Sequence, residues 1–132
     1  MMLAWQDTAL DSAMIYDARL GSSSYGAMFN CLTNEPYPEY YSFTAFNRLY
    51  SLKNQVEVLL DEAGVYSVGA RNGKEGWLVV SNTTEKDLSL DLDMKQKIET
   101  CFITADGKND CEIEFDNRIP AFGLLSIKFR LD

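Results

Sequence analysis

The chain has 132 residues, and its 46% apolar, 24% charged and 12% aromatic residues make a composition typical of one globular domain. A complete (β/α)₈ barrel needs roughly 250 residues, so the length excludes an enzyme of that kind. The net charge of −8 argues against a broad phosphate-binding surface and against a nucleic-acid partner. The absence of histidine excludes Ser-His-Asp and Cys-His catalysis and most transition-metal sites.

Cysteine usage and the first residues bear on the compartment. Cys31, Cys101 and Cys111 form no CxxC pair, so free buried thiols in a reducing compartment are expected rather than a disulfide or zinc framework. The first residues lack the basic region and the long apolar run of a signal peptide, and no window approaches the roughly 20 apolar residues of a membrane span. We therefore expect a cytoplasmic protein that has no membrane partner, no metal and no cofactor, although a signal on a longer parent chain would not be visible.

The first 35 residues predict two short elements followed by a loop. A helix is expected through residues 2–10, and a short buried strand is expected through residues 12–17. Residues 18–35 contain Gly21, Gly26 and a run of three serines between them, which predicts a long loop. A loop of this length is usually either functional or disordered.

One clear helix is predicted over residues 38–52. Pro36, Pro38 and Glu39 suit its start, because proline loses no hydrogen bond in the first turn and an acid there interacts favourably with the helix dipole. Asn54 suits its end, since asparagine tolerates the left-handed conformation that stops a helix. A helix that is apolar on two sides needs two covering layers. The two apolar stripes are Tyr41, Ala45, Leu49 and Leu52 on one side and Phe43, Phe46 and Tyr50 on the other.

Residues 54–132 predict a mainly β fold, an antiparallel β-sandwich of seven to eight strands preceded by the helix. Asn72-Gly73, flanked by the apolar runs 65–71 and 74–81, is the strongest short hairpin signal. Residues 87–94, 111–116 and 124–131 alternate apolar and polar side chains. Such alternation buries one face of a strand and exposes the other, as antiparallel sheets do. The number of short strands in under 80 residues is typical of a sandwich.

The order of these elements resembles the end of a glycosidase (β/α)₈ barrel. Residues 13–19 (AMIYDAR), 25–29 (YGAMF) and 41–50 (YSFTAFNRLY) are similar to the last strand, loop and helix of clan A retaining glycosidases, and in particular of the family 39 type that includes β-xylosidase-like enzymes. In such proteins the last helix leads into a small C-terminal β-sandwich, which residues 65–71 (VYSVGAR), 76–82 (GWLVVSN) and 119–127 (IPAFGLLSI) resemble. The resemblance implies a barrel tail over residues 1–53 and a C-terminal β-sandwich over residues 54–132.

The resemblance also implies what this chain lacks. Retaining glycosidases use two carboxylates about 5 Å apart, one as acid/base and one as nucleophile. In the family these carboxylates follow the fourth and seventh barrel strands, upstream of everything present here. The chain is therefore expected to be no enzyme by itself, but the non-catalytic accessory sandwich of a parent glycoside hydrolase. The alternative is an independent carbohydrate-binding module, which would need exposed, coplanar aromatic side chains on the sandwich.

The expected partner is the catalytic barrel of the parent chain, with carbohydrate as a further ligand. The sandwich would dock on the barrel through the aromatic helix and bury the second apolar stripe of that helix. In the isolated chain we expect the N-terminal segment to fold back over this stripe, or the protein to self-associate through it, because soluble monomers rarely expose large apolar patches.

Four residues are candidates for substrate contact in the intact barrel. Asp17 and Arg19 fall where the last barrel strand meets its loop, on the face that builds barrel active sites. The alternative for them is a structural or exposed ion pair. Tyr25 and Phe29 could supply an apolar platform for a sugar ring. The alternative for these two, and the favoured one, is that they anchor the long loop by packing.

Several other motifs have plainer interpretations. Trp77 and Tyr66 could stack on sugars, but the apolar residues beside Trp77 favour a buried central strand. Asp87, Asp91 and Asp93 could bind calcium, but alternation places them along one solvated strand face. Asn82-Thr83-Thr84 matches a glycosylation sequon and is expected to mark an exposed turn.

The last two cysteines flank an expected turn at residues 106–109. If Ile103 pairs with Ile113 on the buried face, Cys101 and Cys111 lie about four residues out of register. That offset separates the two thiols by about 13 Å at the usual rise of a strand, which is too far for a disulfide.

Overall fold

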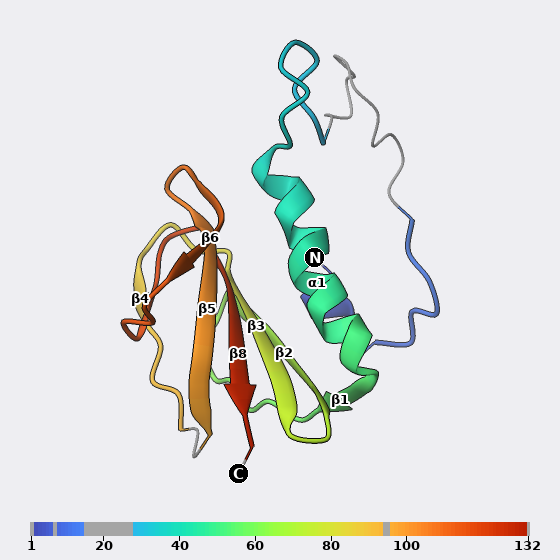
Figure 1. The fold of residues 1–132 in the computed structure, drawn as a ribbon, viewed down its shortest axis with the longest axis vertical. Coiled ribbons are helices and arrows are strands. Elements are labelled where there is room, and N and C mark those ends of the chain that lie inside the picture. Colours follow the sequence, from blue (N-terminus) through green and yellow to red (C-terminus); the bar gives the residue numbers. More distant parts are fainter. Residues whose placement is uncertain (1, 7, 15–27, 94–95, 132) are drawn as a thin grey trace.

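The computed structural model describes residues 2–6, 8–14, 28–93 and 96–131 (Figure 1). One short 3₁₀ helix and one α-helix precede eight strands in the described ranges. In chain order the elements are η1 (Leu3–Trp5), α1 (Pro38–Leu52), β1 (Asn54–Val56), β2 (Val65–Asn72), β3 (Glu75–Asn82), β4 (Leu88–Ser89), β5 (Lys97–Ala105), β6 (Lys108–Ile113), β7 (Arg118–Ile119) and β8 (Leu124–Arg130). None of the described helices is long and apolar enough to cross a membrane.

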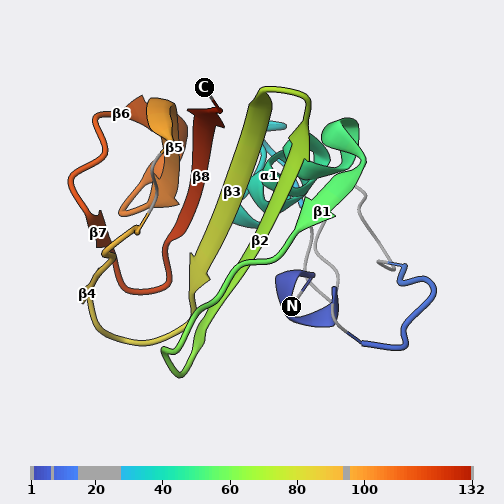
Figure 2. The ribbon, with the colours of Figure 1, turned by 90° about the horizontal axis from the view of Figure 1, so that it is seen from below.

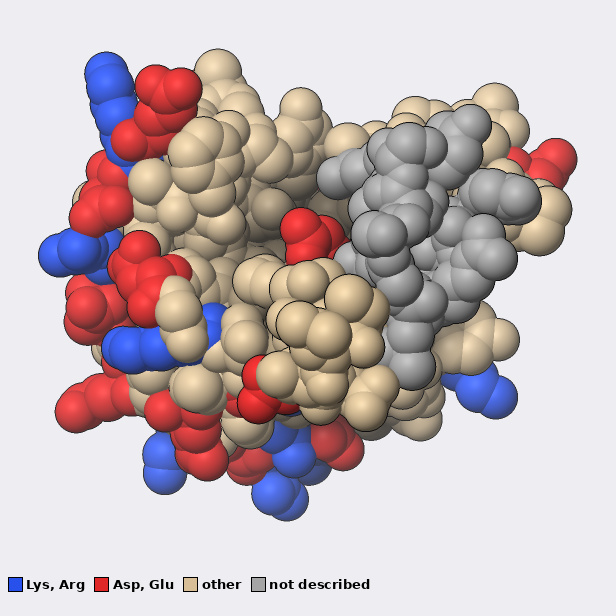
Figure 3. Space-filling model, turned by 90° about the horizontal axis from the view of Figure 1, so that it is seen from above, with Lys and Arg blue, Asp and Glu red and all other residues tan. Residues whose placement is uncertain are grey.

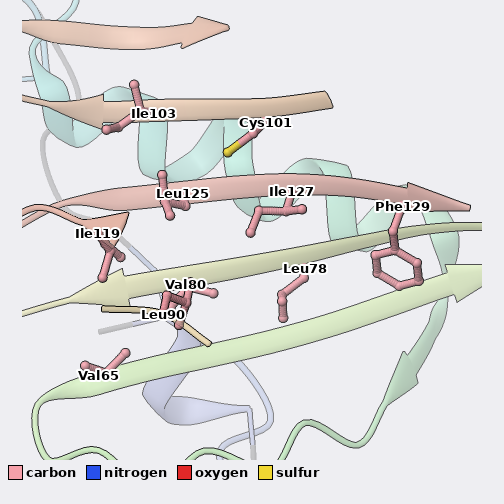
Figure 4. Packing of buried hydrophobic residues seen from close by; sticks show 10 residues of the cluster. All are labelled: Val65, Leu78, Val80, Leu90, Cys101, Ile103, Ile119, Leu125, Ile127 and Phe129. Atoms are coloured by element: carbon pink, nitrogen blue, oxygen red, sulfur yellow. The ribbon is translucent and has the colours of Figure 1, made fainter. Parts of the chain in front are cut away.

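The strands form two antiparallel layers of very unequal size. The large sheet has six strands in the order β1-β2-β3-β8-β5-β6, and the small sheet pairs β4 with β7 (Figure 2). The main hydrophobic core contains side chains from both sheets (Figure 4). Its buried members are Val65, Leu78, Val80, Leu90, Cys101, Ile103, Ile119, Leu125, Ile127 and Phe129. The expected fold class, a mainly β antiparallel sandwich preceded by a helix, is confirmed.

Alternation along the strands explains why the large sheet has two buried faces. In β3, Leu78 and Val80 enter the core between the two sheets, whereas Trp77 and Val79 belong to the face that α1 covers. Both faces of this central strand are therefore covered, and the strand is apolar almost throughout its length. The three layers are the small sheet, the large sheet and α1 (Figure 2).

Both expected hairpin turns are present, one of them shifted by a residue. Asn72 pairs with Glu75, so Gly73 and Lys74 rather than Asn72 and Gly73 occupy the turn between β2 and β3. Gly73 has a φ of 59°, and this first central position is where a type II′ turn needs glycine. Asp106 and Gly107 occupy the turn between β5 and β6, both with positive φ, as a type I′ turn requires.

The predicted register of β5 and β6 is wrong by two residues. Cys101 pairs with Ile113, and Ile103 pairs with Cys111, whereas the prediction paired Ile103 with Ile113. A bulge causes part of the shift, because the register slips by one residue between Ile103 and Ala105. All three cysteines are free, but the expectation that they are buried is wrong for Cys31 and Cys111, which are exposed, and holds only for Cys101 on the core face of β5.

The predicted helix is confirmed at residues Pro38–Leu52, with proline in its first turn and Glu39 beside it. Its stop differs from the prediction. Lys53, with a φ of 66°, takes the left-handed position that was expected of Asn54, and Asn54 already belongs to β1. The helix therefore passes into the sheet without a loop, which places its C-terminal end at one edge of the large sheet.

The N-terminal segment has less regular structure than predicted. Only Leu3–Trp5 form a helix, and it is a 3₁₀ turn rather than a helix through residues 2–10. The strand expected from Ser12 to Asp17 is not formed over residues 12–14, which are exposed, and residues 15–17 lie outside the described residues. A buried strand of a parallel barrel depends on hydrogen-bonded neighbours on both sides. The described part of the chain offers residues 12–14 no such neighbours.

The sequon asparagine is a buried structural residue and not an exposed one, so the expectation of an exposed turn is wrong at this position. Asn82 is only 1% exposed. Its Nδ2 group donates to the carbonyl oxygens of Lys86 at 2.8 Å and Pro120 at 2.9 Å. Its Oδ1 atom accepts from the backbone N–H of Thr84 at 2.9 Å and from the Thr84 hydroxyl at 2.7 Å. Asn82 thus ties the end of β3 to the segment that precedes β8.

We predict that Asn82→Ala lowers the free energy of unfolding by about 2–4 kcal/mol, because several buried backbone groups lose their partner. Chemical denaturation followed by fluorescence measures this loss. Asn47→Ala, at an exposed position of α1, is the matched control and should change stability by less than about 0.5 kcal/mol. Equal effects of the two substitutions would contradict a structural role for Asn82.

We predict that two of the three thiols of the folded protein react with a thiol reagent at neutral pH. Cys31 and Cys111 are exposed, whereas burial, aided by the nearby Asp116 carboxylate, raises the pKa of Cys101 from 9.0 to about 11. Because the folded-state pKa lies above the ordinary value, folding keeps this thiol neutral, and its contribution to stability is lost as pH rises from about 9 to about 11. Cys101→Ser should flatten that part of the stability profile, and reaction of all three thiols in the native state would contradict the assignment.

Candidate functional site

The inner face of α1 packs on the side of the large sheet that faces away from the small sheet. A second hydrophobic cluster fills this junction, with buried side chains from α1, from the sheet and from η1. Its members are Leu3, Ala45, Leu49, Leu52, Val68, Ala70 and Val79. Leu3 of the N-terminal segment thus packs into the inner cluster, whereas Tyr50 of the outer stripe, which this segment was expected to cover, is 73% exposed.

An ion pair links the middle of α1 to the far edge of the large sheet. The two terminal nitrogens of Arg48 donate to the two carboxylate oxygens of Asp110 on β6, each at 2.7 Å. The side chains of Arg48 and Asp110 are only 17% and 19% exposed. This bidentate geometry suits arginine and cannot be reproduced by lysine.

Two aromatic rings hold the same guanidinium. Its central carbon lies 4.3 Å from the ring centroid of Phe102 and 5.0 Å from that of Trp77. The two rings lie on neighbouring parts of the sheet surface, with centroids 6.1 Å apart. Cation–π attraction and the carboxylate thus act on one cation, and we call Arg48, Asp110, Trp77 and Phe102 the arginine clamp.

The backbone of β6 explains why a carboxylate stands at this point. Asn109 and Asp110 both lie opposite Thr104, because Ile103 pairs with Cys111 while Ala105 pairs with Lys108. Asp110 has a φ of 53°, and its N–H donates to the Thr104 hydroxyl at 3.0 Å. The bulge turns the Asp110 side chain toward α1, as bulges commonly re-aim a side chain.

The clamp decides the role of Trp77. Its ring is half-buried rather than fully buried, packs against the cluster beneath α1 and lies under the Arg48 guanidinium. The expectation that Trp77 belongs to the core thus holds in part. Because a cation already covers its ring, Trp77 is no open platform for a sugar. Tyr66, the second candidate for stacking, is 40% exposed.

The outer side of α1 is only partly covered. Phe43 and Phe46 of the second apolar stripe are half-buried, whereas Tyr50 is 73% exposed. Tyr37 and Tyr40 at the start of the helix are also exposed. We call Tyr37, Tyr40 and Tyr50 the outer tyrosines.

Only one of the four expected substrate-contact residues falls in the described part of the chain. Asp17, Arg19 and Tyr25 lie outside the described residues. Phe29 forms an isolated backbone bridge with Pro36, and its ring lies 5.3 Å from that of Tyr40. This packing is what the loop-anchor interpretation of Phe29 expects, and sugar contact by these four residues stays a prediction.

The strand expected over residues 87–94 forms only at Leu88–Ser89 in the described residues, so the prediction that Asp87, Asp91 and Asp93 line one strand face is wrong. Asp87 binds Arg118 at 2.6 Å and accepts a hydrogen bond from the backbone N–H of Ala121 at 3.0 Å. Asp91 and Asp93 are exposed. Within the described ranges, no three acidic or cysteine side chains come together in a way that could hold a metal ion.

Comparisons with known proteins find similarity at the level of the fold. No family model and no curated protein sequence matches the chain. The family 30 subfamily 8 xylanase Xyn30A from Clostridium acetobutylicum has a similar structure, with a TM-score of 0.62 and 14% identity over 83% of this chain and 32% of that chain. A family 30 endoxylanase from Clostridium papyrosolvens C71 matches with a TM-score of 0.59 and 12% identity over 78% of this chain and 30% of that chain.

These matches refine the resemblance seen in the sequence. The chain spans about a third of the length of the xylanase structures that it matches. Both structures belong to glycoside hydrolase family 30, so they do not support the family 39 type in particular. At this level of identity the likeness concerns the fold alone. The fold of this chain is related to that of part of a glycoside hydrolase.

We predict that a double-mutant cycle between Arg48 and Asp110 gives a coupling energy of about 1–3 kcal/mol, because the pair is bidentate and mostly shielded from water. Arg48→Ala, Asp110→Ala and the double variant are compared by chemical denaturation. The Arg118–Asp87 pair, with side chains 59% and 49% exposed, is the control and should couple by less than about 1 kcal/mol. A coupling energy near zero for Arg48 and Asp110 would remove the clamp as a structural link.

Proposed function

We propose that this chain is the non-catalytic accessory sandwich of a clan A glycoside hydrolase, and that it docks on a catalytic barrel through the outer side of α1. The observation that carries the proposal is that α1 is fastened to the sandwich on one side and exposes tyrosines on the other. The fold likeness to parts of two xylanases supports a glycosidase as the parent.

The arginine clamp would make docking through α1 effective, because it fixes the helix to the sandwich. Arg48 and the buried residues Ala45, Leu49 and Leu52 make α1 one rigid unit with the large sheet. A barrel that packs against the outer tyrosines would therefore be held against the whole sandwich and not against a loosely attached helix. The loop before α1 would then be held near the end of the barrel that carries the active site.

The remaining parts of the proposal concern the parent protein. Its two catalytic carboxylates lie upstream of this sequence, and it is of the family 30 or the family 39 type. Asp17, Arg19, Tyr25 and Phe29 would face the substrate only in the intact barrel. Chain and barrel together would form the active enzyme, and the chain alone would be inactive.

An independent carbohydrate-binding module is the alternative. On the sheet surface such a module would need open aromatic rings in one plane. The two rings that lie side by side there, Trp77 and Phe102, are engaged by Arg48. This engagement argues against sugar binding on this face of the sheet, which α1 covers.

Docking predicts a complex between this chain and a family 30 barrel from the same genome that lacks its own last strand, helix and sandwich. Size-exclusion chromatography of the mixture should show co-elution. The chain alone should release no nitrophenol from a panel of nitrophenyl glycosides. Tyr50→Glu should weaken the complex at least about tenfold, because it places a charge in an apolar interface.

Leu59→Glu is the matched control for docking, since Leu59 is 87% exposed in the segment after β1 and does not belong to α1. It should leave the complex intact. Failure of the two components to associate, or an equal effect of the two substitutions, would overturn docking through α1. Glycoside hydrolysis by the isolated chain would overturn its non-catalytic role.

A further inference from the structure

A notch lined by both apolar and polar side chains lies at the end of the molecule where α1 begins. It has a volume of about 440 Å³ and lies between the first turn of α1, the β5–β6 turn and the segment that leads into β8. Figure 3 views the molecule from this end. Its lining includes Glu39, Ser81, Thr104, Lys108, Asn109 and Phe122. None of them belongs to the outer tyrosines or to the arginine clamp.

Phe122 stands in this notch at a backbone position that suits glycine. The N–H of Gly123 donates to the carbonyl of Pro120 at 3.0 Å, which closes a turn with Ala121 and Phe122 as its central residues. Phe122 has a φ of 52°, at the position where turns with positive φ favour glycine or asparagine. A bulky residue in this conformation is strained, and strained residues gather at ligand-binding sites.

No burial compensates for this strain, because Phe122 is 67% exposed. The turn itself is held firmly. The N–H of Phe122 donates to the carbonyl of Thr84 at 3.1 Å, and Asn82 and Asp87 hold the neighbouring Pro120 and Ala121. The protein therefore presents an aromatic ring to solvent on a rigid support, although glycine would fit the backbone better.

Uncommitted polar groups line the same notch. The side chain of Asn109 makes no hydrogen bond with the described residues, and its Oδ1 atom is buried without a donor. The Ser81 hydroxyl has no partner among the described residues either. The Thr104 hydroxyl accepts from the N–H of Asp110 and keeps its own proton to donate. The notch thus contains an amide and hydroxyl groups whose hydrogen-bonding capacity is not satisfied by the described residues.

The charges of the notch do not favour an ion. Glu39 and Asp106 on its rim are opposed by Lys108. A neutral ligand with many hydroxyl groups and an apolar ring face fits this set of groups best. Sugars combine these properties, since the C–H face of a pyranose packs on an aromatic ring while its hydroxyl groups bond amides and hydroxyls.

We propose that the notch binds a neutral saccharide chain, with Phe122 as the platform and the side chains of Ser81, Thr104 and Asn109 as hydrogen-bonding groups. The choice of a sugar as ligand rests on the proposed function. The N-terminus of a barrel helix follows the loop at the active-site face. A notch at the start of α1 therefore lies on the side from which a polymeric substrate would approach a docked barrel.

The test is affinity electrophoresis of the isolated chain in gels that contain xylan, mixed-linkage β-glucan or mannan. We expect retardation in at least one gel. Phe122→Gly should reduce this affinity at least tenfold while leaving the protein as stable as before or more stable, because glycine relieves the positive φ. Phe122→Asn should act in the same way, whereas Phe122→Tyr should keep binding.

Tyr66→Ala is the matched control, since it removes an exposed aromatic ring that does not line the notch. It should bind as the unaltered chain does, and Asn109→Ala should bind at least fivefold more weakly. Migration unaffected by all three polysaccharides, or equal affinity of Phe122→Gly and the unaltered chain, would overturn the proposal. These outcomes are independent of docking, because association with a barrel is measured through Tyr50 and without saccharide.

Discussion

The attachment of α1 to the large sheet is the constraint on which the arrangement of this protein depends. A cluster of apolar side chains packs between α1 and the sheet, and the Arg48 guanidinium binds Asp110 on the edge strand β6. The cation meets a carboxylate in a bidentate geometry and two aromatic rings at once. Because the ion pair is shielded from water, its partners depend on each other more than those of a surface pair would.

This attachment separates the molecule into surfaces with different roles. The inner side of α1 is structural, and so is the sheet surface that contains Trp77. The outer tyrosines are exposed on the other side of α1, and the notch around Phe122 lies at the start of this helix. In the proposed docking, a helix fixed in this way would transmit the position of a barrel to the sandwich.

Much of the fold could be predicted from the sequence, because local patterns determine it. Prolines and an acid predicted the start of α1 at Pro38. The alternation over residues 124–131 predicted β8, and the Asn72-Gly73 pair predicted a turn to within one residue. The strand expected over residues 87–94 forms only at Leu88–Ser89, and the one expected over residues 111–116 is displaced to Lys108–Ile113. These signals come from the backbone preferences of single residues and from the alternation of polar and apolar side chains along a strand. Both are set by residues close together in the sequence.

The tertiary structure alone decided the roles of single polar residues. Asn82 belongs to a sequon in the sequence, yet its amide is buried and bonds segments up to 38 residues away. Arg48 and Asp110 are 62 residues apart, and the bulge that brings them together also changed the predicted register. The exposed ring of Phe122 and the positive φ of its backbone correspond to no apolar–polar alternation in the sequence. Such roles depend on contacts between residues that are far apart in the sequence. The sequence by itself determined only which segments have an apolar face that must be buried.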